Sequence, residues 1–224
     1  MKRFLFILIF LLFSFSSYSQ TDFGIKLNGG FSKITATRYN SSNFFDQWPL
    51  SWQGGLYYNV FIFKRIFIGV ETVFNQMQGK EKTEYPNYDN GILTKDSVVI
   101  NTSKSVSFIG NSINIGYKYK RFTLSFGFQY SFTIASNVNN KISMPFSGSI
   151  INLEFDKKQD VYDKLVTGLK AGIYYDLTKR FSIEGAYYHG LRVFYNTEPD
   201  RWNGKFRQMT IGIRFKINRP IDKK

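Results

Sequence analysis

Apolar and polar residues alternate along much of this chain with a period of two. From Phe122 to Ile134 every even position is large and apolar, while the odd positions hold Thr, Ser, Gly and Gln. Successive side chains of a β-strand point to opposite faces, so this pattern predicts a strand with one apolar and one polar face. The alternation recurs in other segments, which predicts an all-β chain.

Eight strands are expected from this pattern. Three segments each hold two long strands joined by a tight turn that carries a Lys-Arg pair, namely Lys64-Arg65, Lys120-Arg121 and Lys179-Arg180. One further strand precedes them at residues 23–34 and one follows at residues 206–217. The tight turns alternate with longer polar connections, among them residues 79–104 and 137–164. Short turns at one end and long loops at the other are typical of outer-membrane β-barrels.

The two faces of the strands distinguish a membrane barrel from a soluble one. A soluble lipocalin-like barrel keeps its apolar face inside and needs a well charged outer face. The polar face of residues 122–134 is small and uncharged, whereas its apolar face is too bulky for the interior of eight strands. We therefore expect an eight-stranded antiparallel transmembrane β-barrel with short periplasmic turns and long extracellular loops. The expected lipid-facing residues are Phe122, Leu124, Phe126, Phe128, Tyr130 and Phe132.

The fourth strand departs from regular alternation. Val106 and Phe108 occupy even positions, but Ile113 and Ile115 occupy odd ones. This change of phase predicts a β-bulge near residues 110–111. Aromatic residues near strand ends, such as Trp52, Tyr119, Tyr174 and Phe181, are candidates for the girdles of a membrane barrel.

Six charged residues are expected to point into the barrel. Eight strands leave an interior that side chains just fill, so charges there must be paired to offset their desolvation. We expect Glu71 and Glu184 to bond the neighbouring cations as a plug across the lumen. A gated, anion-selective pore would use the same residues. The predicted lumen network is Lys26, Glu71, Lys170, Glu184, Arg192 and Arg214.

The first residues of the chain are typical of a secretory signal peptide. A cationic start is followed by an apolar run at residues 4–13 and by small residues, and the run is too short for a permanent membrane helix of about 20 residues. We expect residues 1–19 to be removed, residues 20–217 to form the barrel, and residues 218–224 to be a periplasmic tail. The chain has no cysteine, which excludes disulfides.

The formal net charge of +14 favours contact with anionic groups, and export excludes nucleic acid as the source of those groups. We expect outer-membrane lipid and lipopolysaccharide to fill this role, with the Lys-Arg turns at the inner leaflet. The turns are also candidates for docking a periplasmic or outer-membrane protein. The barrel is expected to be a monomer without a cofactor or metal.

Few residues are candidates for a catalytic, metal-binding or modification site. The single histidine, His189, shares the predicted lipid face with Leu191, where a deacylase-like site would place a serine. The acidic residues Glu154, Asp156, Asp160 and Asp163 fit no calcium-loop spacing. Asp96-Ser97-Val98 resembles a short O-glycosylation acceptor, so Ser97 is a candidate for modification.

The hairpins closed by Lys-Arg turns, the FGIKLNGG opening and the last strand MTIGIRFKI resemble the small PorT-like outer-membrane proteins of Bacteroidetes. The resemblance covers residues 20–217. It implies an eight-stranded barrel in the outer membrane, and one member of that family is tied to a protein secretion system. We expect a structural or interaction role through the extracellular loops, without catalysis. The alternatives are an accessory of secretion or assembly, a narrow channel, and a lipid-modifying enzyme.

Overall fold

The computed structural model describes residues 21–37, 47–89, 92–146, 149–158, 165–194 and 203–218. The predicted signal peptide and residues 219–224 of the predicted tail lie outside these ranges. No helix in the described ranges is long and apolar enough to cross a membrane. These ranges hold nine strands, which are β1 (Thr21–Thr37), β2 (Leu50–Phe61), β3 (Ile66–Asp89), β4 (Ile92–Tyr119), β5 (Phe122–Phe146), β6 (Ser149–Lys158), β7 (Leu165–Asp176), β8 (Phe181–Phe194) and β9 (Asn203–Lys216).

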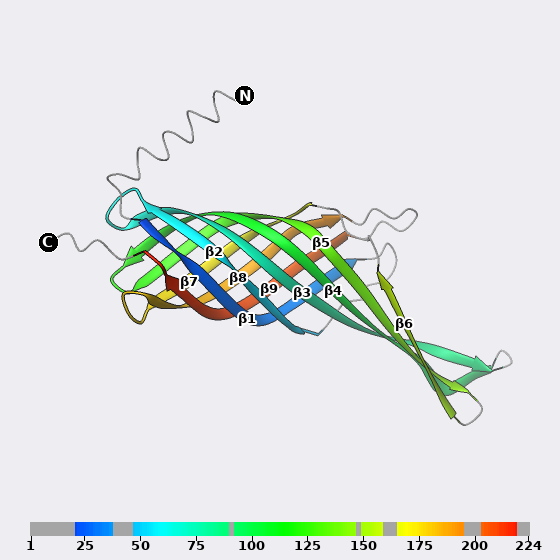
Figure 1. The fold of residues 1–224 in the computed structure, drawn as a ribbon. Helices are drawn as coiled ribbons and strands as arrows, with labels where there is room; N and C mark the ends of the chain where they lie inside the picture. Colours follow the sequence, from blue (N-terminus) through cyan, green and yellow to red (C-terminus); the bar gives the residue numbers. More distant parts are fainter. Residues whose placement is uncertain are drawn as a thin grey trace.

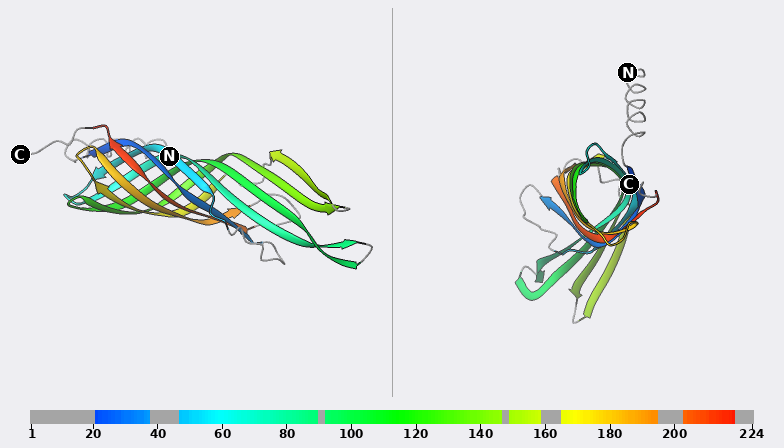
Figure 2. Two further views of the ribbon diagram at one scale, coloured as in Figure 1. Left: turned by 90° about the horizontal axis from the view of Figure 1, so that it is seen from below. Right: turned by 90° about the vertical axis from the view of Figure 1, so that its left-hand side faces the viewer.

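Eight of these strands close into a ring. Each pairs antiparallel with the next in the order β1, β2, β3, β4, β5, β7, β8, β9, and β9 pairs with β1. The end-on view in Figure 2 shows the closed ring. The predicted eight-stranded antiparallel barrel is therefore confirmed. Among the described strands, β6 stands outside the ring and pairs with β5.

Two connections that the sequence reading assigned to polar loops consist largely of strands. β3 and β4 have 24 and 28 residues, and β5 has 25, whereas a tilted strand crosses a membrane in about 9 to 11 residues. The surplus forms two hairpins, β3–β4 and β5–β6, that project from one end of the barrel (Figure 1). We call residues 80–89, 92–104, 137–146 and 149–158 the arm. The prediction of loops at 79–104 and 137–164 was wrong for these segments.

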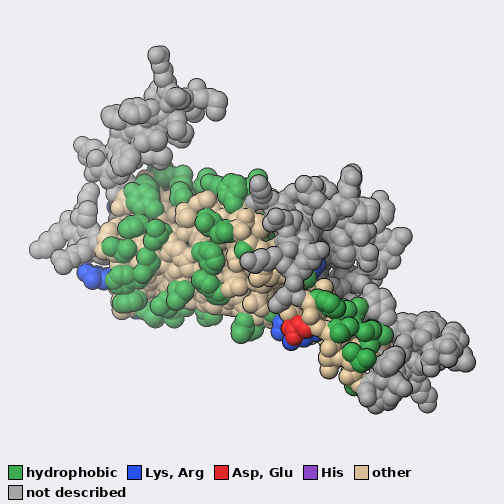
Figure 3. Space-filling view, turned by 45° about the vertical axis from the view of Figure 1, so that its right-hand side comes forward, with side chains coloured by type: hydrophobic (Ala, Val, Ile, Leu, Met, Phe, Trp, Pro, Cys, Tyr) green, Lys and Arg blue, Asp and Glu red, His purple; other side chains and the backbone are tan. Residues whose placement is uncertain are grey.

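The barrel wall is apolar outside and polar inside. The outward positions of β5 from Phe122 to Ile134 are exposed apart from the half-buried Tyr130. The inward positions Thr123, Gln129 and Ser131 are buried. Figure 3 shows apolar side chains spread over the barrel wall, with charged ones toward its ends. An apolar outer surface of this kind is favourable in contact with lipid, whereas its exposure to water costs free energy.

The predicted bulge near residues 110–111 is wrong, and the irregularity lies elsewhere. Ser107 pairs with Ala135 and Phe108 with Thr133, so Ile134 of β5 has no partner in β4. The face of β4 does not change along this stretch, because Val106 and Phe108 are buried on the same side as the inward polar residues. The apparent break in the sequence is an apolar patch inside the barrel.

The start of β1, the end of β9 and the three short turns lie at the barrel end opposite the arm (Figure 1). Asn218 closes this end next to β1. Its side-chain oxygen accepts a hydrogen bond from Phe23 N–H at 2.8 Å, and its amide donates to the Thr21 carbonyl. Ile217 N–H also donates to Phe23 O at 2.8 Å. These hydrogen bonds hold the end of β9 against the start of β1.

Candidate functional site

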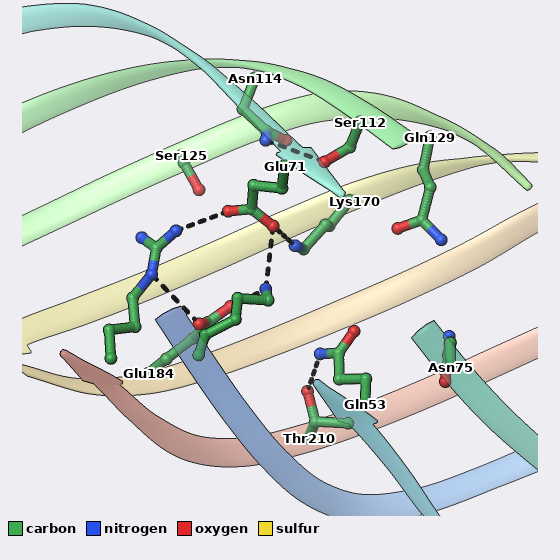
Figure 4. A network of polar contacts seen from close by, with 12 residues as sticks. Gln53, Glu71, Asn75, Ser112, Asn114, Ser125, Gln129, Lys170, Glu184 and Thr210 are labelled. Carbon is green, nitrogen blue, oxygen red and sulfur yellow. Dashed lines mark hydrogen bonds and ion pairs between the residues drawn. The ribbon is translucent and has the colours of Figure 1, made fainter. Parts of the chain in front are cut away.

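Five charged side chains from five strands meet in the lumen (Figure 4). Lys26 Nζ donates to Glu71 Oε2 and to Glu184 Oε1, both at 2.9 Å. Lys170 Nζ donates to the same Glu71 oxygen, and Arg214 donates to Glu71 Oε1 at 2.7 Å. Arg214 Nε lies 3.4 Å from Glu184 Oε2. All five side chains are buried. Glu71 is the hub of this network, because it contacts all three cations.

The network holds three cations and two carboxylates, so its formal charge is +1. Arg214 has additional partners in two tyrosines. Its guanidinium lies 3.9 Å from the ring centroid of Tyr57 and 4.2 Å from that of Tyr174. The faces of aromatic rings attract cations, which helps to offset the desolvation of Arg214.

The structure places five of the six predicted lumen residues in this network. The sixth, Arg192, lies in β8 opposite Thr167, and its side chain is outside the described part of the chain. The sequence reading missed Tyr57 and assigned Tyr174 to a girdle. Tyr174 is buried in the lumen because it lies four residues after the inward-facing Lys170 in β7, and residues an even number apart share a face.

Uncharged polar side chains fill the next part of the lumen. Asn75 and Gln208 exchange amide hydrogen bonds at 3.0 and 2.9 Å, and Gln208 also donates to Ser51 Oγ. Gln53 donates to Thr210 Oγ1 at 3.0 Å, and Gln129 to Ser131 Oγ at 3.0 Å. Gln129 and Ser131 both belong to β5, whereas the other bonds join β9 to β2 or β3 past the intervening β1.

An apolar layer closes the half of the lumen nearer the arm. Its members are almost fully buried, and the rings of Phe108 and Phe206 pack edge to face with centroids 5.2 Å apart. We call this layer the apolar plug. It explains the apparent change of phase in β4, since Val106 and Phe108 belong to it. Its residues are Met77, Val106, Phe108, Val166, Tyr188 and Phe206.

Ion pairs line the mouth at the turn end. Lys118 Nζ lies 2.8 Å from Asp176 Oδ2, and Lys216 Nζ lies 3.1 Å from Asp22 Oδ2. Ser182 Oγ donates to Asp176 Oδ1 at 2.6 Å. A shallow pocket lies between these side chains and the rings of Tyr57 and Tyr174. The carboxylates of the mouth are therefore bound by cations of the strands themselves.

The two faces of the arm differ in polarity. Ile100, Ile142 and Leu153 lie directly opposite one another on β4, β5 and β6 and form an apolar row. The other face carries the pairs Ser143–Asn152 and Lys141–Glu154. Hydrogen bonds from Asn139 and Lys141 hold the pKa of Glu154 below its usual value. The arm therefore has an apolar face that continues the inner wall of the barrel.

The structure also places two other residues that the sequence analysis named, His189 and Ser97. His189 lies on the outer wall, where its Nδ1 is 3.2 Å from the Tyr187 hydroxyl oxygen. Ser97 is exposed in β4, opposite Pro86. Asp160 and Asp163, two of the acidic residues whose spacing fits no calcium loop, lie outside the described residues. Within the described ranges, no group of three or more metal-ligating side chains comes together.

The family described as outer membrane protein beta-barrel domain matches residues 4–220. The chain belongs to this family. No curated protein matches it. In outer-membrane barrels the short turns are periplasmic, so the turn end faces the periplasm and the arm projects outside the cell.

Several solved outer-membrane proteins are similar to this barrel. Ail of Yersinia pestis, in complex with sucrose octasulfate, has a TM-score of 0.39 and 11% identity, and the match covers 87% of this chain and 99% of that chain. Neisserial surface protein A has a TM-score of 0.42 and 13% identity, with 87% and 97% covered. The protease OmpT of Escherichia coli has a TM-score of 0.42 and 11% identity, with 89% and 95% covered.

Proposed function

We propose that this protein is a closed outer-membrane barrel that binds another protein through the outermost strand of its arm, without catalysis or conduction. The observation that carries the proposal is the position of β6. It pairs with β5 along one side, and its other edge has no partner strand among the described residues. The arm is on the extracellular side, so this edge faces the surroundings of the cell.

An unpaired strand edge presents backbone N–H and C=O groups that an added strand can bind. Natural edge strands are commonly protected by proline or by many charges. Between Ile150 and Phe155, β6 has four large apolar residues and a single charge, Glu154. The side chains of Ile151, Leu153 and Phe155 share one face and are exposed. A fitting partner therefore supplies an extended segment with an apolar residue at every second position.

The filled lumen supports a role outside the barrel. The charged network and the apolar plug occupy successive parts of the same interior, and their side chains are almost completely buried. A conducting pore needs a continuous path of water. We infer that the network serves as a rigid plug and that the outward apolar residues of β5, Phe122 to Phe132, contact lipid.

The position of His189 supports a role without catalysis. Its ring is on the outer wall beside Tyr187, whereas a hydrolytic histidine needs a nucleophile on one side and an orienting acid on the other. Lipopolysaccharide is the proposed lipid around the outer half of the barrel. Residues 1–19 are the proposed signal for export.

A second candidate follows from the resemblance to PorT-like proteins. In that case the arm binds a component of a secretion or assembly system in the outer membrane. Both candidates use the edge of β6, and they differ in whether the bound protein belongs to the same cell.

A photo-reactive amino acid at Ile151 tests the use of this edge in intact cells. We expect a protein adduct at this position and none from the same group at Ile211, which lies on the barrel wall. Leu153→Lys should remove the adduct, because it places a cation in the apolar row. Asn152→Lys should preserve it, since Asn152 points to the polar face. An adduct that survives Leu153→Lys, or no adduct at all, would refute the proposal.

A further inference from the structure

The three Lys-Arg turns occupy equivalent places around the periplasmic end of the barrel. In each, the arginine carbonyl accepts a hydrogen bond from a backbone N–H of the adjacent strand. The pairs are Arg65 O with Lys118 N at 2.7 Å, Arg121 O with Asp176 N at 2.8 Å, and Arg180 O with Lys216 N at 2.8 Å. The repeated bond sets the three turns at one level, so their six exposed cations form a ring. We call these six residues the basic rim; the turns that carry them lie at the barrel end opposite the arm (Figure 1).

Apolar side chains adjoin the basic rim on the barrel side. Each arginine is followed directly by an apolar residue that begins the next strand, namely Ile66, Phe122 or Phe181. Phe122 and Phe181 are exposed on the outer wall, as is Phe63 just before the first pair. Apolar residues at this level are at the edge of the hydrocarbon layer. The cations one residue further out are therefore at the level of the lipid phosphates.

Contacts within the rim hold cations at the outer wall. The Arg65 guanidinium and the Lys120 ammonium lie 5.6 and 5.5 Å from the ring centroid of Tyr119. Arg65 also donates to the Tyr117 hydroxyl at 3.2 Å. The carboxylates Asp22 and Asp176 are in the mouth, where Lys216 and Lys118 bind them. At Arg65 and Lys120 the positive charge of the rim is therefore held at the outer wall.

Lys120 occupies a backbone position that favours glycine. Its φ angle is 54°, in the left-handed region, and it is the first of the two turn residues between Tyr119 and Phe122. Glycine or asparagine adopts this conformation at lower cost. Lysine at this position therefore costs backbone strain that glycine would avoid.

We propose that the basic rim binds the phosphodiester head groups of anionic phospholipids in the periplasmic leaflet. Three pairs at one level would contact the same leaflet around the barrel and set its depth in the membrane. This binding is independent of the arm and of any extracellular partner. An acidic periplasmic protein is the competing occupant, but the apolar residues beside each pair favour a lipid surface.

Native mass spectrometry of the folded barrel, with phosphatidylglycerol or phosphatidylcholine of the same chain lengths, tests the proposal. The rim variant carries Lys64→Gln, Lys120→Asn and Lys179→Gln. The control carries Lys80→Gln, Lys82→Gln and Lys205→Gln, which removes the same charge from exposed sites away from the rim. We expect the rim variant to retain several-fold less phosphatidylglycerol than the control, with little phosphatidylcholine on either. Equal phosphatidylglycerol retention by the two variants would refute the proposal. The proposal would also be refuted if the native barrel bound polyglutamate through the rim but did not bind phosphatidylglycerol.

The single variant Lys120→Gly separates lipid binding from folding. Glycine relieves the left-handed backbone, so thermal stability in detergent should stay the same or rise. Phosphatidylglycerol retention should nevertheless fall, because one cation is lost from the rim. Unchanged retention would indicate that the side chain is not used for lipid and would count against the proposal.

Discussion

At the scale of single residues, the charge balance of the lumen depends on Glu71. This carboxylate contacts Lys26, Lys170 and Arg214, and Glu184 shares two of these cations. Replacing Glu71 by glutamine leaves three cations with one carboxylate, so the buried charge rises from +1 to +2. Breaking a buried ion pair by removing one partner costs about 3 to 5 kcal/mol. Because the barrel wall keeps water away from these side chains, an unpaired charge in the network has no solvent to stabilise it, and one substitution is costly.

We therefore expect Glu71→Gln to lower the free energy of unfolding by about 3 to 5 kcal/mol, measured by urea titration of the folded barrel in lipid vesicles. Glu154→Gln is the matched control, because it removes a carboxylate that pairs with Lys141 on the exposed arm. Its effect should be small. Equal effects of the two substitutions would show that the lumen network does not stabilise the barrel.

Glycine positions offer a second comparison of single residues. A Cβ atom added at Gly116 would lie 2.1 Å from Phe67 Cζ and 2.9 Å from the Leu124 carbonyl oxygen, whereas one added at Gly29 would meet nothing within 4 Å. We expect Gly116→Ala to cost about 1 to 3 kcal/mol of unfolding free energy through overpacking. Gly29→Ala should be close to neutral in the same titration. A neutral Gly116→Ala would mean that the interior near Phe67 is loosely packed.

At the scale of strands, the same residue type has two environments. Phe126 on the barrel wall and Phe155 on the arm have similar exposed fractions, 55% and 52%. Only the first is expected to face lipid. Phe126→Lys should destabilise the barrel by about 2 to 4 kcal/mol, the cost of a cation near the middle of a membrane. Phe155→Lys should have little effect on unfolding in vesicles. The reverse order would contradict the assignment of the wall to the membrane.

Alternation was sufficient to predict the ring but not the arm. In β5 the polar and apolar faces are clear, and strand parity placed Lys26, Glu71, Lys170, Glu184 and Arg214 on inward faces before any contact was known. The arm was read as loop because its polar face holds Asn, Ser and Lys residues, which resemble loop composition. Two sequence patterns favoured strands in the arm. Apolar residues occupy alternate positions around Ile100, Ile142 and Leu153, and the Asn-Gly pair at 90–91 is a frequent hairpin-turn sequence.

The apolar plug could not be found from alternation, for a physical reason. A period of two tells which residues share a face but not which face is inside. Val106 and Phe108 are apolar and inward, whereas most apolar residues of the wall are outward. These two residues share a face with Ser112 and Asn114 only if β4 has no bulge between them, and the uninterrupted pairing of β4 with β3 shows that it has none there. The pairing across the ring is information that a single strand does not contain.

At the scale of the whole molecule, the proposed plug would close the barrel at two places along its axis. The charged network and the apolar plug occupy successive parts of the lumen, so we expect them to act as two barriers in series. Ions that pass one barrier still meet the other. Removing a single barrier should therefore leave the barrel closed, and conduction should need the loss of both.

Planar bilayer recordings check this expectation. The native protein should give no steady conductance steps, and neither should Phe108→Ala with Phe206→Ala, which opens only the apolar plug. Arg214→Ala with Tyr57→Ala, which opens only the charged end, should also be silent. The four substitutions together should produce conductance, provided that the variant still migrates as a folded barrel on unheated gels. Anion-selective steps from the native protein, lost on Arg214→Ala, would instead establish a channel. The two layers would then be a filter and its gate.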